Sequence, residues 1–546
     1  MLLRRPCLTA VLAGLISATG FAPLAWWPAT LAALAVLLHL IASASNWRGA
    51  ALLGWLFGVG HFTFGNGWIA TAFTYQAEMP AWLGWIAVFA LALYLAVYPM
   101  LATLGAWLLA THFRNSRVGG DPVANGSNAA PELGSRLRGN DEVWGLILAF
   151  AALWTITEWL RSWVFTGFVW NPLGMVALGP WSRPGLALIA PWLGTYALSA
   201  LVVLLGGCWW LASREPRLTH KLVLAAAPVF ALLVPQLYAP AAQPGTMPFT
   251  LVQPNIPQDE LTDASKYESQ FRRTAGLSLA RHPGQRRVVL WPESGVPDYL
   301  RPGYPAAFYG ETTYGSDPGL ARARIGRVIG PNSLLLTGAV DLVMERREVI
   351  AADNAVTALD GDGRIRSGYT KAHLVPYGEY LPMRSLLEPL GLSRLVAGTL
   401  DFRAGPGPRT LNLAPWGRIG VQLCYEIIFS GQVVERGNRP DFLFNPSNDG
   451  WFGRFGPPQH LAQARMRAIE EGLPILRSTT NGISAMIDAN GVVRGHIAED
   501  RAARIDGVVP RAHLPTLFAR TGNLLGLGWA LVLLALCAIA LRRRSR

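Results

Sequence analysis

The sequence predicts two structural classes in one chain: an α-helical bundle of membrane spans, and an α/β domain. Of its 546 residues, 51% are hydrophobic and 15% are charged, whereas a soluble domain carries about 25% charged residues. The charged side chains of the first 110 residues are Arg4, Arg5, Arg48 and Glu78, while residues 250–510 are densely charged. This distribution excludes a disordered chain and a purely soluble enzyme.

Eight apolar segments are candidates to cross a bilayer, whose hydrocarbon core of about 30 Å needs around 20 helical residues. They are 8–24, 26–43, 50–71, 81–111, 143–164, 186–212, 220–238 and 522–541. We therefore expect residues 1–240 to form seven transmembrane helices and residues 522–541 to form a C-terminal one. The Gly-, Asn- and Ser-rich segment 118–141 is typical of a flexible insertion between two of them.

The basic residues of the short loops predict the orientation, because Lys and Arg are enriched on the cytoplasmic side of a membrane. With seven spans before the polar domain, one side carries Arg4, Arg5, Arg48, Arg114, Arg117, Arg136, Arg138, Arg214, Arg217, Lys221 and Arg542 to Arg544. The other side carries Glu78, Arg161 and Arg183. We expect both chain ends and the 118–141 insertion in the cytoplasm, with the polar domain on the opposite side.

One span contains a pair of ionisable residues, Glu158 and Arg161, which are three residues apart and so share a helix face. Charged groups within a span are costly and often functional. Two interpretations stay open: a mutually satisfied pair at the outer membrane surface, or a group that binds lipid head groups.

The net charge, the cysteines and the histidines argue against nucleic-acid binding, a disulfide framework and a metal site. The net charge is +13, but the basic residues lie largely beside apolar segments and form no nucleic-acid-binding motif, so we expect no nucleic-acid partner. The four cysteines do not make a disulfide framework. The nine histidines show no metal-ligand spacing, and we expect no metal site.

From residue 246 the pattern changes to short β-rich segments. They include PFTLVQPN, RRVVLWPES, SLLLTGAV, NAVTALD, RIGVQLCYE, DFLFNPSND and GISAMIDANG, and helical segments such as HLAQARMRAIEEG fall between several of them. Strands that alternate with helices predict an α/β domain with a buried sheet over residues 246–512.

Three predicted strands end in reactive side chains: Glu293, Lys371 and Cys424. Each has an ordinary interpretation when taken alone, as a helix cap or surface acid, a solvated lysine and a buried core cysteine. Together they make a coherent chemical set. A carboxylate can take the proton of a thiol, an ammonium can favour the thiolate and stabilise an oxyanion, and sulfur can carry an acyl group.

The sequences around these residues resemble the carbon-nitrogen hydrolase (nitrilase) superfamily, whose members place Glu, Lys and Cys in this order at three strand ends. The resemblance implies an α-β-β-α sandwich for the polar domain. With seven predicted membrane spans before this domain and one after it, the whole chain resembles the apolipoprotein N-acyltransferase family of the bacterial inner membrane. The motifs that carry this resemblance are VQPNIPQ (252–258), WPES (291–294), YTKAHLVPYGEYLP (369–382), LCYEIIF (423–429), NPSNDGWFG (445–453), QHLAQARMRAIEEG (459–472) and NGISAMIDANG (481–491).

The resemblance implies a role for each matching residue. Glu293 would be the general base, Lys371 the oxyanion stabiliser and Cys424 the nucleophile. We expect Cys424 to sit in an aqueous, electropositive site, where Lys371 lowers the pKa of the thiol. Three supporting positions match Glu379, Tyr425 and Glu426. The family often has a tryptophan shortly after NIPQ, in a loop thought to help admit lipid, whereas the nearest aromatic residue in this sequence is Tyr267.

The implied reaction transfers an acyl chain from the sn-1 position of a phospholipid, through a cysteine thioester, to the α-amine of the diacylglyceryl-cysteine of an apolipoprotein. It needs no cofactor. The resemblance places the enzyme in the bacterial inner membrane with a periplasmic catalytic domain, and we expect it to act as a monomer.

Two other functions are compatible with parts of this sequence. A membrane-bound amidase acting on a small substrate would use the same three residues, but seven preceding spans exceed what a tether needs. A transporter with an extracytoplasmic binding domain is disfavoured because the spans are poor in charge.

Overall fold

The computed structural model describes residues 5–75, 80–118, 140–346, 348–387, 389 and 401–542. The expected insertion 118–141 lies outside the described residues except at its ends. The chain divides into two compact units. The helical unit comprises 1–70, 82–239 and 516–546, and the sandwich unit comprises 71–81 and 240–515.

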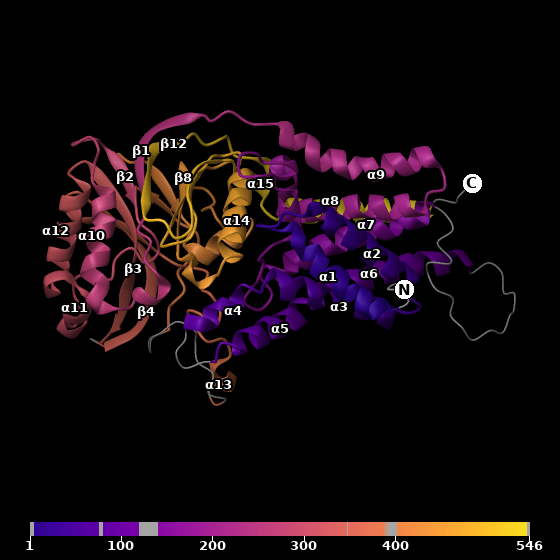
Figure 1. Cartoon of the computed structure of the whole chain (residues 1–546), viewed down its shortest axis with the longest axis horizontal. Helices are drawn as coiled ribbons and strands as arrows, with labels where there is room; N and C mark the ends of the chain where they lie inside the picture. Colours follow the sequence, from indigo (N-terminus) through magenta and orange to yellow (C-terminus); the bar gives the residue numbers. More distant parts are fainter. Residues whose placement is uncertain are drawn as a thin grey trace. The chain divides into compact units, whose positions relative to one another are not determined.

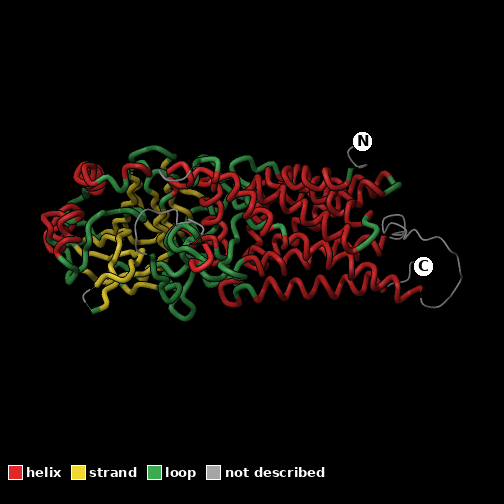
Figure 2. Tube along the Cα trace, turned by 90° about the horizontal axis from the view of Figure 1, so that it is seen from below, coloured by secondary structure: helices red, strands yellow, loops and turns green. Residues whose placement is uncertain are grey.

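The helical unit consists of helices that run alongside one another (Figures 1 and 2). They are α1 (Pro6–Ser17), α2 (Trp27–Ser43), α3 (Trp47–Gly65), α5 (Leu83–Leu95), α6 (Val97–Val118), α7 (Asn140–Arg161), α8 (Ala190–Arg214), α9 (Leu218–Leu233), α15 (Leu517–Thr521) and α16 (Leu524–Arg542), while the short α4 is Ile69–Ala72. Within the described ranges, five helical stretches are long and apolar enough to cross a membrane. They are Leu83–His112, Glu142–Arg161, Leu186–Arg214, Leu218–Leu237 and Leu524–Arg542.

Glycine residues bring α1 and α3 into backbone contact. A Cβ on Gly14 would lie 2.0 Å from the carbonyl oxygen of Phe57, and one on Gly60 would lie 2.3 Å from that of Val11. Any larger residue at either position would therefore push the two helices apart. Small residues serve this purpose in membrane proteins, where close backbone approach supplies much of the packing energy.

The ion pair Glu158–Arg161 in α7 is buried and hydrogen-bonded to other groups of the protein. Arg161 Nη2 lies 3.7 Å from Glu158 Oε1, and Arg161 Nη1 donates to the carbonyl oxygens of Phe168 and Trp170, each at 3.1 Å. Glu158 accepts from the Leu173 backbone N–H at 2.8 Å and from the Ser199 hydroxyl. The pair thus fixes the irregular segment after α7, which favours the mutually satisfied pair over a lipid head-group site.

The sandwich unit contains two six-stranded sheets among its described residues. The first has the order β12-β1-β2-β3-β4-β5 and the second β11-β10-β9-β8-β7-β6. The strands are β1 (Pro244–Gln253), β2 (Arg287–Leu290), β3 (Ser333–Glu345), β4 (Glu348–Asp360), β5 (Ile365–Thr370), β6 (Thr410–Asn412), β7 (Arg418–Val421), β8 (Phe442–Ser447), β9 (Ile475–Thr479), β10 (Ser484–Ile487), β11 (Val493–Ile497) and β12 (Ala503–Pro510).

Helices cover the outer face of each sheet. Helices α10 (Tyr267–Ser278), α11 (Ala306–Thr312) and α12 (Pro318–Ile329) lie on the side of the first sheet, and α14 (Gly456–Glu471) lies on the side of the second (Figure 1). The inner faces meet through β1 and β9, where the Thr479 hydroxyl donates to Gln253 Oε1 at 2.9 Å. The unit is therefore the α-β-β-α sandwich that the sequence predicts.

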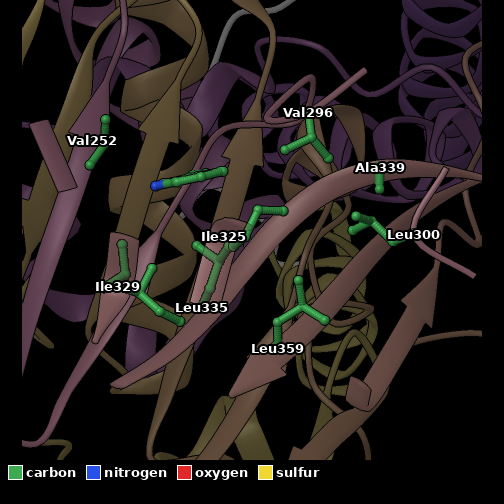
Figure 3. Close-up of a cluster of buried hydrophobic side chains, with 10 residues drawn as sticks. Val252, Val296, Leu300, Ile325, Ile329, Leu335, Ala339 and Leu359 are labelled. Carbon is green, nitrogen blue, oxygen red and sulfur yellow. The ribbon is translucent and has the colours of Figure 1, made fainter. Parts of the chain in front are cut away.

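A hydrophobic cluster holds α12 against the first sheet (Figure 3). Ile325 and Ile329 of α12 pack with Val289 of β2, Leu335 of β3 and Leu359 of β4, and all five are fully buried. Burial of such side chains is worth about 1.5–3 kcal/mol each. This cluster holds β2, whose end leads into Glu293, together with its neighbours β3 and β4.

The pairing of the strands brings two of those ends to one edge. Strands β2 and β3 are parallel, and β4 is antiparallel to both β3 and β5. Strand β5 therefore runs in the direction of β2, and the two strands end on the same side of the sheet. Glu293 follows β2, and Lys371 follows β5.

Candidate active site

Glu293 lies on a sharp turn that crosses over β3. The backbone N–H of Gly338 donates to the Pro292 carbonyl at 3.0 Å, and a Cβ on Gly338 would lie 1.6 Å from the Glu293 carbonyl oxygen. Only glycine fits beneath this turn. The carboxylate accepts from Asn354 Nδ2 at 2.9 Å through Oε1 and from the Asn448 backbone N–H at 2.9 Å through Oε2.

Lys371 is a buried ammonium held by two carboxylates. Its side chain is 1% exposed, and Nζ lies 2.9 Å from Glu379 Oε1 and 3.3 Å from Glu293 Oε1. Burial alone would lower the pKa of Lys371, but Glu379 and Glu293 outweigh it and hold this pKa above its usual range. Lys371 therefore carries a positive charge at neutral pH.

Cys424 stands at a strained bend between β7 and the 3₁₀ helix η12 (Cys424–Ile428). Its φ is +51°, a conformation that costs a non-glycine residue of order 1–3 kcal/mol and that clusters at functional sites. The residue is only 5% exposed. Burial raises the pKa of the thiol, Glu293 raises it further, and Lys371 lowers it by less.

This environment corrects one expectation drawn from the sequence. We expected Cys424 to sit in an aqueous, electropositive site where Lys371 lowers the pKa of the thiol. Lys371 does act in that direction, but the pKa is raised overall because burial and the Glu293 carboxylate outweigh the ammonium. The resting group is therefore a thiol, and a base is needed to make it a nucleophile.

Glu426 ties the bend of Cys424 to the end of β5. Its Oε2 accepts from the Leu423 backbone N–H at 2.7 Å. Its Oε1 accepts from the Tyr369 hydroxyl and the Ala372 N–H, both at 2.7 Å, and from the His373 N–H at 3.1 Å. Burial raises the pKa of Glu426, and these donors partly offset that effect. The group is a structural link between the two sheets.

The other supporting residues are Glu379, Tyr425 and Tyr267, of which the first two lie next to triad residues. Glu379 bridges Lys371 and Asn354 through Oε1, and Tyr425 is buried beside the nucleophile, edge-on to Phe429 at 5.2 Å. Tyr267 opens α10 and is half-buried. Burial and then Asp263, rather than a residue of the triad, raise the pKa of Tyr267.

Residues 13–208 match the family of the apolipoprotein N-acyltransferase N-terminal domain, and residues 250–503 match the carbon-nitrogen hydrolase family. A protein named apolipoprotein N-acyltransferase from Rhodopseudomonas palustris is 34% identical over 98% of this chain and 95% of its own length. Relatives with the same name from Bradyrhizobium diazoefficiens and Brucella melitensis are 34% and 32% identical over 98% and 85% of this chain. The chain belongs to the apolipoprotein N-acyltransferase family. It is thus an enzyme of a family with a nitrilase-type domain.

The structure also adds residues to this candidate site that sequence reasoning missed. Asn354 of β4 donates to both Glu293 and Glu379, and the backbone N–H of Asn448 supports Glu293 and reaches the sulfur of Cys424. Asn448 lies in the NPSNDGWFG motif, which gave a usable signal. Asn354 lies in an ordinary strand segment and gave none.

Proposed function

We propose that this protein transfers an acyl chain from the sn-1 position of a phospholipid, through a thioester on Cys424, to the α-amine of the N-terminal diacylglyceryl-cysteine of an apolipoprotein. The observation that carries the proposal is the convergence of Glu293, Lys371 and Cys424 in one buried site. Membership of the acyltransferase family supports the choice of substrates.

In the first half-reaction, Glu293 takes the proton of the Cys424 thiol, and the thiolate attacks the ester carbonyl of the phospholipid. The carbonyl oxygen becomes an oxyanion, which the Lys371 ammonium stabilises in a site of low dielectric. The carbon-oxygen bond then breaks. The glyceryl oxygen takes the proton from Glu293 and leaves as a lysophospholipid, and the acyl group stays on sulfur.

In the second half-reaction, the α-amine of the apolipoprotein attacks the thioester carbonyl. Glu293 takes a proton from the attacking nitrogen, the carbon-sulfur bond breaks, and the sulfur leaves with a proton from Glu293. The products are an N-acylated lipoprotein and the free thiol. The burial of Cys424 suits this step, because water that reached the thioester would hydrolyse it.

A membrane location fits substrates with acyl chains. Each buried CH₂ of a lipid is worth about 0.8 kcal/mol, so a two-chain lipid does not readily leave the bilayer. We infer seven spans within residues 1–240, a catalytic domain over 246–512 and a last span over 522–541, with the catalytic domain on the periplasmic side of the bacterial inner membrane. The enzyme would work as a monomer.

The chemistry can be tested with the purified full-length protein and phosphatidylethanolamine in the absence of an acceptor. Mass spectrometry should find one acyl group on the protein, located on Cys424, and an equal amount of lysophospholipid. A protein that releases free fatty acid with no adduct, or that cleaves small amides without any effect of phospholipid, would instead be a membrane-bound amidase.

The orientation can be tested with an engineered thiol, because Cys424 is buried. Glu311 is exposed on α11 of the catalytic domain, and Glu311→Cys supplies an accessible site. A membrane-impermeant maleimide should label this variant in intact spheroplasts, whereas the unsubstituted chain measures background. Labelling that requires a broken inner membrane would place the domain in the cytoplasm and overturn the topology.

A further inference from the structure

A buried cluster outside the triad contacts the backbone of the nucleophile. His460 of α14 has Nε2 3.1 Å from the Cys424 carbonyl oxygen and Nδ1 3.0 Å from Asp449 Oδ1. Arg477 of β9 places Nη2 2.7 Å from both Asp449 oxygens and 3.0 Å from His460 Nδ1. The side chains of His460, Asp449 and Arg477 are completely buried.

The chemistry of the contacts decides where the imidazole carries its proton. A carbonyl oxygen can only accept a hydrogen bond, so Nε2 of His460 must donate to Cys424. Burial and the Arg477 guanidinium lower the pKa of His460, and the Asp449 carboxylate partly offsets them. On the opposite side of the ring, Nδ1 lies 3.0 Å from both Asp449 Oδ1 and Arg477 Nη2, and Asp449 balances the charge of Arg477. Contacts at both ring nitrogens therefore fix the orientation of the imidazole.

The bond to Cys424 acts where the backbone is strained. A φ of +51° at a cysteine persists only if the surroundings hold it. Glu426 holds the chain just before the bend through the Leu423 N–H, and His460 holds it just after through the Cys424 carbonyl. The direction of the Cys424 side chain depends on both restraints.

The same cluster extends to the group that supports the base. Asp449 directly follows Asn448, whose backbone N–H donates to Glu293 Oε2 at 2.9 Å and reaches the sulfur of Cys424. Gly482 leaves room for the Asp449 side chain, because a Cβ on Gly482 would lie 2.4 Å from Asp449 Oδ2. One cluster thus restrains both the nucleophile and a donor to the general base.

We propose that His460 is a positioning residue for acyl transfer: it holds the Cys424 carbonyl so that the thiol faces Glu293 and Lys371, while Asp449 and Arg477 fix the imidazole. This inference rests on the proposed function, because it concerns Cys424 as the acyl carrier. His460 itself exchanges no proton with the substrate.

Two polar substitutions separate positioning from other roles. In His460→Gln, the amide nitrogen can take the place of Nε2 and donate to the Cys424 carbonyl. In His460→Asn, the amide is one carbon shorter and cannot reach it. We expect the single-turnover rate of Cys424 acylation by phosphatidylethanolamine to fall about 100-fold in His460→Asn, the loss typical of a misplaced reacting group, and less than about 10-fold in His460→Gln.

Two further measurements distinguish positioning from structural damage or proton transfer. The phospholipid concentration at half-maximal rate should be unchanged in His460→Asn, and its pH profile should keep the native midpoint. Arg465→Gln is the matched control, since Arg465 is buried on the same helix and donates to the Gly491 carbonyl rather than to Cys424. This control should keep the native acylation rate in its folded fraction.

Different results would overturn the positioning role of His460 and the proposed function. Equal rates for His460→Asn and the unsubstituted enzyme would overturn the inference, and so would a complete loss in His460→Gln, which would make His460 a proton-transfer group. If His460→Asn fails to fold, the rate and pH profile of His460→Gln still decide between positioning and proton transfer. A native enzyme that forms no adduct at all would defeat the proposed function instead.

Discussion

A buried ion pair in the helical unit and a buried ion-pair cluster in the sandwich unit do different work. In the helical unit, Glu158 and Arg161 bind backbone groups and a serine around the segment that follows their helix. In the sandwich unit, Lys371 binds Glu293 and Glu379 next to a buried thiol. Burying charge is costly in both places. The difference teaches that burial alone does not reveal the role of a charged pair. The neighbouring atoms do: backbone groups indicate a structural role, and a nearby thiol indicates a chemical one.

The largest effect should come from removing the sulfur. Cys424→Ala leaves the other charged groups of the sandwich unit in place, so we expect a folded protein with no acyl adduct and no N-acylated lipoprotein. Mass spectrometry of the protein and of the acceptor gives both readings. Product formation by this variant would show that the ion pair acts without covalent catalysis.

The next largest effect should come from the two groups that act on the sulfur. Glu293→Gln removes the base, and general-base catalysis typically contributes about 10²–10⁴-fold, so acylation of Cys424 should slow by that factor. Lys371→Arg should also be poorly tolerated, because a planar guanidinium does not reproduce a compact ammonium between two carboxylates. Single-turnover acylation measures both. A native rate in Glu293→Gln would assign another role to Glu293.

Glu379→Gln should have an intermediate effect. The amide keeps the size of the side chain but removes one of the two carboxylates that hold the Lys371 ammonium. We expect a folded enzyme, by circular dichroism, whose acylation rate falls by about 10–100-fold, less than for loss of the base itself. If turnover were unaffected, Glu293 alone would suffice to keep Lys371 charged.

A smaller effect concerns the pH at which the thiol reacts. The pKa of Cys424 is raised, and the thiolate is the reactive form, so alkylation by iodoacetamide should have its midpoint above the value of about 8.5 for a free cysteine. Glu293→Gln removes a negative charge and should lower the midpoint. Lys371→Met removes a positive charge and should raise it. Shifts of the same sign in both variants would contradict the electrostatic account.

Substitution in the helical unit should leave the chemistry unchanged and affect only stability. Arg161→Met leaves Glu158 buried without its partner, and breaking a buried ion pair costs about 3–5 kcal/mol. Thermal unfolding in detergent should show this loss, while the folded fraction should form the Cys424 adduct at the native rate. A slower adduct in fully folded Arg161→Met protein would mean that the pair also serves the reaction.

Glu293, Lys371 and Cys424 could be singled out from the sequence because each ends a recognisable strand and lies in a distinctive motif. Glu379 and Glu426 followed from the resemblance of these motifs to a known family. Asn354 could not be found from the sequence. Its position near Glu293 depends on how β4 pairs with β3, where Asn354 lies opposite Val340, and the sequence does not show this pairing. The burial of Cys424 was missed for a similar reason: a strand end shows where a residue stands in the chain but not which segments later cover it.

The membrane spans show the same limit. Apolar length predicted long helices at 81–111 and 186–212, and the structure has helical stretches at Leu83–His112 and Leu186–Arg214. The first predicted span, 8–24, overlaps the shorter α1, which begins at Pro6 and ends at Ser17. Hydrophobicity alone could not locate that end, because the chain stays apolar through the 3₁₀ turn Ala18–Gly20 that follows.

The four hydrogen bonds accepted by Glu426 have a consequence for how the enzyme makes room for its substrates. They join the bend before Cys424 to Tyr369, Ala372 and His373 at the end of β5, so the Cys424 sulfur and the Lys371 ammonium lie in one rigidly connected part of the sandwich. Separating the two sheets there would leave the buried Glu426 carboxylate without hydrogen-bond donors, at a cost of several kcal/mol. For the proposed acyl transfer, we therefore expect surface loops around this region to accommodate the acyl chain, while Glu293, Lys371 and Cys424 keep their spacing.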